Sequence, residues 1–249
     1  MSVAKPARRV WEAVEAPPRG PAAIPACRSP HLTTPFTLVP QDLETAASEA
    51  EQDLALAGIA EITDPQALCC LAFHRAAAVR RWVAASPYAS YDVLDWLSAD
   101  EAPGVRTAVA GHPRAPQRAL AMLTQDRDDG VRCAAVRNEA LPGRLVARLE
   151  EDPNPTIRLW VARHPQVPMP TLRGLAKDAD PDVRAAVARA DRTPPLALQE
   201  LATDPHARVR FAVARHPRVP APAVDRLLSD PLPAIRQEMR EALAAHRAE

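Results

Sequence analysis

The sequence repeats itself every 26 residues, and this period constrains the fold more than any other feature of the chain. A β-branched residue followed by arginine recurs at that interval without insertion or deletion, as Val79-Arg80, Val105-Arg106, Val131-Arg132, Ile157-Arg158, Val183-Arg184, Val209-Arg210 and Ile235-Arg236. An aspartate stands five residues before each β-branched residue, except that His74 replaces it in the first repeat. Such a period is the signature of an array in which each repeat packs on its neighbours.

Each repeat predicts two short helices separated by a turn. Val105, Val109 and His112 lie at i, i+4 and i+7, the spacing of one helical face, which predicts a first helix over about residues 103–111. Pro113 ends this helix, because the residue before a proline is pushed out of the α region.

The second helix of the repeat begins near a recurrent proline. Pro116 suits its first turn, where a missing N–H costs no hydrogen bond, and Leu120 and Leu123 supply a narrow apolar stripe. Asp126 is expected to cap the first helix of the next repeat by accepting from its backbone N–H groups. Helices this short are unstable alone, so we expect stacking to stabilise them.

Three segments are expected along the chain. Residues 1–40 hold eight prolines and are predicted to be extended or disordered. Residues 41–75 are predicted to form a helical N-terminal cap with a degenerate repeat, in which Leu68 and Leu71 fall at second-helix contact positions. Residues 76–249 are predicted to be the repeat array, closed by a C-terminal capping helix.

The repeat text D-x-x-x-x-V-R-x-x-V-A-x-H-P followed by P-x-x-x-L-x-x-L resembles the leucine-rich-repeat variant family, known from bacterial proteins. The resemblance covers about residues 76–240. It implies an all-α fold, a right-handed α-solenoid (superhelix) of about seven 26-residue two-helix repeats with α and 3₁₀ or short α helices and no β-sheet. It implies no enzymatic activity. The aspartate and arginine spacing also resembles the ladder of HEAT repeats, whose units are longer.

Some members of this family carry an N-terminal iron–sulfur cluster domain with closely spaced cysteines. This sequence departs from that pattern, because its cysteines Cys27, Cys69, Cys70 and Cys133 include no C-x-x-C pair. Stacked helices about 8 to 10 Å apart would keep Cys133 far from Cys69. We therefore expect no metal site and no cofactor, with these four cysteines as weak cluster candidates.

Arginines and histidines recur at fixed repeat positions and are open to two interpretations. The arginines of the ladder, Arg80 to Arg236, could bind phosphates, but their period matches that of the aspartates and favours salt bridges between repeats. His112, His164 and His216 share one repeat position, but lie too far apart for joint metal ligation. We expect them to form hydrogen bonds at helix ends.

Other positions are candidate binding residues. Trp96 and Met122 occupy a variable second-helix position and are predicted to be exposed, and an exposed tryptophan is a candidate interface anchor. A second arginine set ends the first helices and continues into the turn: Arg137, Arg163, Arg189 and Arg215, with Arg114, Arg192 and Arg218. These arginines either compensate helix dipoles or form a basic ridge for an acidic protein surface or nucleic acid.

The sequence contains no recognisable catalytic motif, so the expected function rests on the predicted repeat fold. No Ser/His/Asp grouping, Gly-rich phosphate loop or paired His-Glu motif occurs, so we expect no enzyme. Formal net charge is zero, with −4 over residues 1–100 and +4 over 101–249, and no apolar run reaches the roughly 18 residues of a membrane span. We predict a cytoplasmic, non-catalytic scaffold that binds a protein or peptide and no membrane. The alternatives are a nucleic-acid-binding HEAT-like repeat protein and, ranked below it, an iron–sulfur (4Fe-4S) redox-associated repeat protein.

Overall fold

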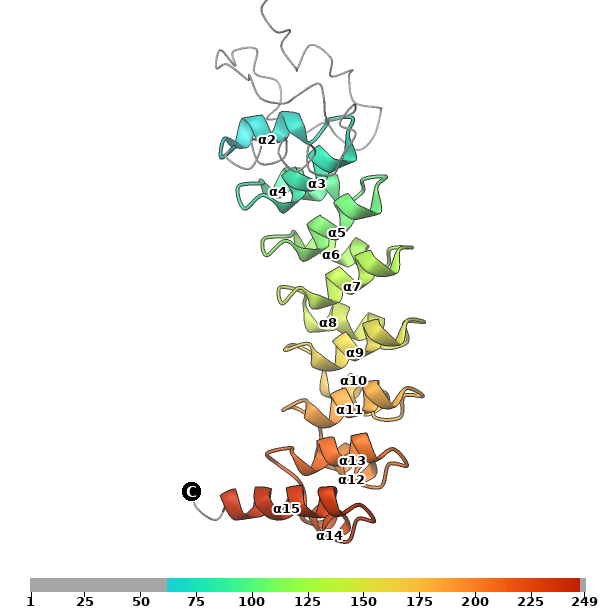
Figure 1. The fold of residues 1–249 in the computed structure, drawn as a ribbon. Helices are drawn as coiled ribbons and strands as arrows, with labels where there is room; N and C mark the ends of the chain where they lie inside the picture. Colours follow the sequence, from blue (N-terminus) through green and yellow to red (C-terminus); the bar gives the residue numbers. More distant parts are fainter. Residues whose placement is uncertain (1–61, 247–249) are drawn as a thin grey trace, which may run out of the picture. The chain divides into compact units, whose positions relative to one another are not determined.

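A computed structural model describes residues 62–246, and within this range every regular element is a helix (Figure 1). The predicted all-α solenoid of 26-residue two-helix repeats is confirmed. The proline-rich stretch 1–40 with Cys27, and residues 41–61 of the predicted N-terminal cap, lie outside the described residues. The chain divides into two compact units, one ending at Ala140 and the other beginning at Leu141.

The first unit contains two complete helix pairs, preceded by the second helix of an earlier repeat and followed by the first helix of the next. Its described helices are α2 Pro65–Leu71, α3 Ala77–Ala85, α4 Tyr91–Leu97, α5 Pro103–Gly111, α6 Gln117–Leu123 and α7 Asp129–Arg137. The first helices of successive repeats pack on one another, α3 on α5 and α5 on α7. Leu68 and Leu71 of α2 are buried in the same core, as the 26-residue register predicts.

The second unit continues the same pattern. Its elements are α8 Gly143–Val146, the 3₁₀ helix η4 Ala147–Leu149, α9 Pro155–Arg163, α10 Met169–Leu175, α11 Pro181–Arg189, α12 Pro195–Leu201, α13 Ala207–Ala214, α14 Ala221–Leu228 and α15 Pro233–His246. Here α9 packs on α11, α11 on α13 and α13 on α15. The second helices are short, and one of them passes from α8 into η4.

The core is built from the periodic apolar positions. All seven β-branched residues that precede the ladder arginines are at most 2 % exposed. Leu120 and Leu123 of α6 are equally buried, so the apolar stripe of the second helix faces inward as predicted. Each buried Val, Leu or Ile contributes roughly 1.5–3 kcal/mol, and the short helices depend on this burial.

The recurrent proline lies one residue earlier than the sequence predicts. Pro116 is the N-cap residue of α6, with φ −58° and ψ 139°, rather than a residue of its first turn. Pro142, Pro168, Pro194 and Pro220 take the same place before the other second helices. Proline fixes φ near −65°, which suits this extended residue, and its missing N–H is not needed there.

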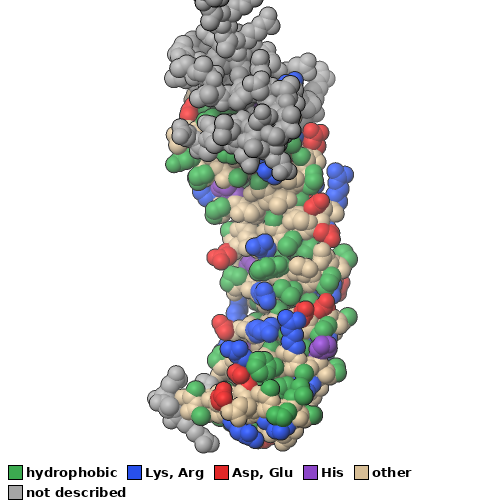
Figure 2. All heavy atoms as spheres, in the orientation of Figure 1, with side chains coloured by type: hydrophobic (Ala, Val, Ile, Leu, Met, Phe, Trp, Pro, Cys, Tyr) green, Lys and Arg blue, Asp and Glu red, His purple; other side chains and the backbone are tan. Residues whose placement is uncertain are grey.

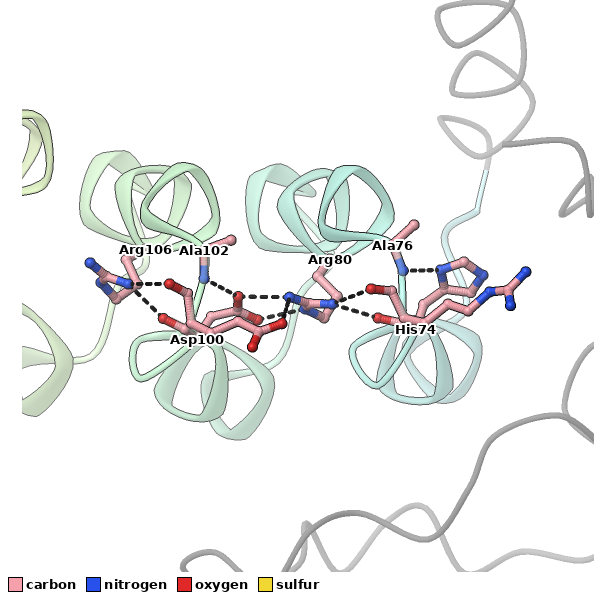
Figure 3. Close-up of polar contacts among 8 residues, drawn as sticks. His74, Ala76, Arg80, Asp100, Ala102 and Arg106 are labelled. Carbon is pink, nitrogen blue, oxygen red and sulfur yellow. Dashed lines mark hydrogen bonds and ion pairs between the residues drawn. The ribbon is translucent and has the colours of Figure 1, made fainter. Parts of the chain in front are cut away.

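A ladder of arginine and aspartate joins successive repeats. Nε and Nη2 of Arg80 donate to the two carboxylate oxygens of Asp100 at 2.6 and 2.9 Å, while Nη1 donates to the carbonyls of His74 and Arg75 (Figure 3). The paired fork recurs in Arg106 with Asp126, Arg158 with Asp178, Arg184 with Asp204 and Arg210 with Asp230. The predicted salt bridges between repeats are therefore confirmed, in the bidentate geometry that gives the strongest ion pairs.

Pairing keeps these groups charged despite their burial. Burial raises the pKa of Asp126, but the hydrogen bonds from Arg106 and from the Asp128 backbone N–H outweigh it, so the pKa lies below its ordinary value. The pKa is lowered in the same way at Asp178, Asp204 and Asp230. The hydrogen bond to Asp126 raises the pKa of Arg106 against the opposing effect of burial.

The aspartate of the ladder does not cap the helix that follows it, so that expectation is wrong. Oδ1 of Asp126 accepts from the backbone N–H of Asp128 at 2.9 Å, and Asp128 is itself the N-cap residue of α7. The carboxylate is held by Arg106 in the turn, two residues before the N-cap. In the first repeat Nδ1 of His74 accepts from the Ala76 N–H at 3.1 Å and replaces the aspartate in this turn (Figure 3).

Candidate functional site

Histidines at the ends of the first helices tie each turn to the preceding one. The buried His112 places Nε2 3.1 Å from the Ser86 carbonyl, while Nδ1 accepts from the Arg114 N–H at 3.0 Å. His216 makes the same two contacts with the Ala190 carbonyl and the Arg218 N–H. Because Nδ1 accepts, the ring proton must lie on Nε2, and the ring is neutral. The predicted helix-end hydrogen bonding is confirmed.

Burial makes this histidine position sensitive to pH. Burial lowers the pKa of His112 and of His216 below the ordinary value, because the protonated ring loses its hydration. Below about pH 6.5 the unfolded chain therefore binds more protons than the folded one. The free energy of unfolding falls as the pH drops from there towards the lowered pKa of the folded state.

The chain already contains an uncharged substitute for this histidine. Asn138 occupies the equivalent position after α7, where Nδ2 donates to the Ala110 and His112 carbonyls and Oδ1 accepts from the Ala140 N–H. We expect the double variant His112→Asn/His216→Asn to keep its stability at neutral pH. Its loss of stability between about pH 6.5 and pH 5 should be smaller than in the unchanged protein.

Urea unfolding followed by circular dichroism at several pH values measures this difference. The control is His206→Asn, which changes the exposed histidine at the N-cap of α13, where the ring is not buried as at His112 and His216. If the double variant kept the full pH dependence of the unchanged protein, the helix-end histidines would not be its source.

Three of the arginines predicted as candidate binding residues lie at the ends of successive first helices in the second unit. We name these three, Arg163, Arg189 and Arg215, the arginine column. Arg163 and Arg189 are the last residues of α9 and α11, and Arg215 directly follows α13. All three are exposed, and basic side chains gather over these helices (Figure 2). Arg137 occupies the same position at the end of α7 in the first unit. The sequence thus places these arginines correctly at helix ends.

The column differs from the ladder in what its arginines contact. The Arg163 guanidinium lies over the Trp160 ring, 5.5 Å from its centroid, and Arg189 donates to a carbonyl of its own helix at 3.4 Å. Among the described residues no carboxylate lies within salt-bridge distance of Arg163 or Arg189. Arg215 has one such contact, 3.4 Å from Glu238.

The neighbours of Arg189 are themselves positive. The pKa of Arg189 is lowered, first by burial and then by repulsion from Arg208, Arg163 and Arg215. The pKa of the five ladder arginines whose aspartate pairs are given above is instead raised, mainly by the hydrogen bond to the aspartate. Arg208 is paired with Asp182. The column is therefore a locally positive surface, in which only Arg215 has a carboxylate partner among the described residues.

The turn arginines mainly contact the backbone of the preceding turn. Arg114 lies over the Tyr91 ring, 5.3 Å from its centroid, and donates to the Pro87 carbonyl at 3.3 Å. Arg218 donates to the Asp191 carbonyl in the same way. Arg192 and Arg218 line an open pocket of about 290 Å³ together with Met169, Thr193 and Pro195. These residues lie at the turn edge of the array, apart from the end positions of the first helices.

The prediction that Trp96 is exposed is wrong. Trp96 is half-buried and packs against Phe73, with ring centroids 5.2 Å apart, because the turn after α2 covers it. Met122 at the equivalent position is 49 % exposed. Sequence reasoning missed the exposed Tyr88 and Tyr91, which follow no repeat consensus. Trp160 stands at a position where four other repeats have alanine and the first has Trp82, and this departure was a signal for the ring beside Arg163.

The described cysteines lie in the first unit. Cys69 is buried, and Cys70 and Cys133 are half-buried. Between residues 62 and 246, no three His, Cys, Asp or Glu side chains form a group that could hold a metal ion. In the same range none of the helices has the length and apolarity that a membrane span requires. The absence of a cofactor stays a prediction.

Comparison with known proteins agrees with this architecture. The family model described as leucine rich repeat variant matches residues 103–128. A solved structure titled "A leucine-rich repeat variant with a novel repetitive protein structural motif" is 28% identical, with a TM-score of 0.61 over 81% of this chain and 79% of that chain. These findings support a helical repeat protein with the leucine-rich repeat variant fold. The resemblance carried by the repeat motif is confirmed, while no curated protein matches this chain.

Proposed function

We propose that this protein is a non-catalytic scaffold that binds a protein or peptide partner through the arginine column. The repeat fold supports this, because stacked repeats present long continuous surfaces formed by equivalent positions. The observation that carries the proposal is the contrast between two sets of arginines in one fold. The ladder arginines Arg80, Arg106, Arg158, Arg184 and Arg210 are largely buried and paired with aspartates. Arg163 and Arg189 are exposed and have no carboxylate partner among the described residues.

An exposed charge without a partner is rarely needed for stability. A basic residue in the last turn of a helix compensates the helix dipole by about 0.3–1 kcal/mol. Two equivalent helix ends in the first unit have no basic residue and therefore lack this contribution. Ala85 and Gly111 stand at the equivalent ends of α3 and α5. A partner surface that supplies carboxylates explains the column better, because it gains charge pairs that the fold does not already use.

Affinity capture from the native cell tests the proposal. We expect the variant Arg163→Ala/Arg189→Ala/Arg215→Ala to lose partners that the unchanged full-length chain retains. The matched control is Arg144→Ala/Arg173→Ala/Arg226→Ala, which removes the same charge from exposed second-helix positions of the same unit. Capture profiles that are identical for the unchanged chain and the column variant would contradict the proposal.

A further inference from the structure

The arginine column repeats at a distance that the helix packing sets. Its residues lie at the ends of α9, α11 and α13, and each of these helices packs directly on the next. Axes of packed helices are about 8–10 Å apart, so the column offers one guanidinium group for each step of about that length. A partner that uses the whole column needs acidic groups on one side at the same interval.

A polyproline II segment meets this requirement with the simplest sequence. It has three residues per turn and rises about 3.1 Å per residue, so every third side chain points the same way, about 9.3 Å apart. In a β-strand, side chains three residues apart point to opposite faces. In an α-helix, acids seven residues apart would be needed, about 10.5 Å along the axis.

The surroundings of the column also suit such a segment. The half-buried Trp160 ring lies beside Arg163, and the half-buried Phe211 occupies the next-but-one first helix. Polyproline II segments dock on aromatic surfaces, because proline rings pack on aromatic faces and the chain is already ordered. Each aromatic residue thus stands three or four residues before a column arginine, Trp160 before Arg163 and Phe211 before Arg215, which is the spacing of neighbours on one helix face.

Acids on the same face argue against a nucleic-acid strand. Asp182 pairs with Arg208, and Glu238 lies 3.4 Å from Arg215. In duplex DNA each strand carries one phosphate per about 3.4 Å of helix axis, a denser spacing than that of the column arginines, so a bound nucleic acid would bring phosphates against these carboxylates. Peptide carboxylates about 9 Å apart can pair with the column arginines and stay away from Asp182 and Glu238.

We infer that the arginine column binds an acidic peptide segment in the polyproline II conformation, with Asp or Glu at every third position. This inference rests on the proposed function, because it names the chemistry of the partner at the same surface. The predicted consequence is recognition of acid spacing, in addition to recognition of negative charge.

Fluorescence anisotropy with the full-length chain and two labelled peptides tests the inference. One peptide consists of Glu-Pro-Ala triplets, and the other has the same composition with its glutamates in one block. We expect the triplet peptide to bind roughly tenfold more tightly than the block peptide. The column variant should lose about tenfold in affinity for the triplet peptide, and the second-helix control variant less than about twofold.

Several results would overturn the inference. Equal affinity for the two peptides would show that spacing is not recognised, and equal losses in the two arginine variants would show that only net charge matters. A single-stranded DNA of equal charge that displaces the triplet peptide would favour the nucleic-acid alternative. If the column variant loses its partners in affinity capture while both peptides bind equally, the proposed function stands and this inference alone fails.

Discussion

Replacing Asp204 by alanine is expected to lower the free energy of unfolding by about 3 kcal/mol, the cost of removing one partner from a buried ion pair. The Asp204 carboxylate accepts from Arg184 at 2.6 and 3.0 Å and from the His206 N–H at 2.8 Å. The side chains of Asp204 and Arg184 are only 5% and 13% exposed. Without Asp204 the guanidinium of Arg184 stays buried with its charge unpaired.

Urea unfolding with linear extrapolation measures this loss. The control is Asp182→Ala, which removes the partner of the exposed Arg208 and should cost about 0–1 kcal/mol. If Asp204→Ala and Asp182→Ala had equal effects, the buried ladder would contribute no more than an ordinary surface pair.

The ladder aspartates also predict how the stability of the protein responds to acid. The pKa of Asp126, Asp178, Asp204 and Asp230 is lowered in the folded protein, so their contribution is fully present above the unfolded pKa of about 3.9. It is lost as the pH falls from there through the lowered folded values. We expect Asp204→Ala to show a shallower loss of stability below about pH 4, because one of these carboxylates is gone.

Deleting residues 178–203 is expected to leave a folded, shorter array, because this segment is one whole repeat. Asp204 would then follow Lys177 directly, and Arg158 would meet Asp204 at the sequence interval at which it now meets Asp178. The free energy of unfolding should fall by the share of one repeat, about 1–4 kcal/mol at typical per-residue stability. The helical circular dichroism per residue should change little.

The matched control removes half as many residues. Deleting 178–190 removes α11 and the turn before it, so α10 and α12, the second helices of two repeats, would follow each other. Asp191 would then stand at the sequence interval from Arg158 that Asp178 now occupies, so this control changes the order of the helices rather than the spacing of the ion pair. We expect this variant to lose cooperative unfolding in the second unit. If both deletions were tolerated equally, the 26-residue register would not determine which repeats can stack.

The periodic features of this fold could be predicted because they depend on local patterns. The end of α5 at Gly111 follows from Pro113, and the buried anchors such as Val105 follow from helical spacing. The salt bridges of the ladder follow from two residue types that share one period. Neighbouring repeats repeat the same contacts, so a single correct repeat predicts the rest.

The candidate site was harder to predict because it depends on positions that vary between repeats. Trp96 was misplaced, since its burial depends on Phe73 in a degenerate repeat that the consensus does not describe. The sequence separated the ladder arginines from the second set by their period, but it could not show which arginines of the second set are paired, because Glu238 beside Arg215 belongs to no repeat consensus. Only the side-chain contacts in the structure show which arginines are paired.

His74 shows that the ladder has a direction. Each ladder aspartate from Asp100 onwards is preceded, 20 residues earlier, by a β-branched residue and arginine, but the residue 20 before His74 is Leu54. A carboxylate at position 74 would have no arginine at that interval, while the imidazole nitrogen accepts the Ala76 N–H without adding negative charge. The two ends of such an array are therefore chemically unequal, and a first repeat cannot simply be a copy of those that follow it.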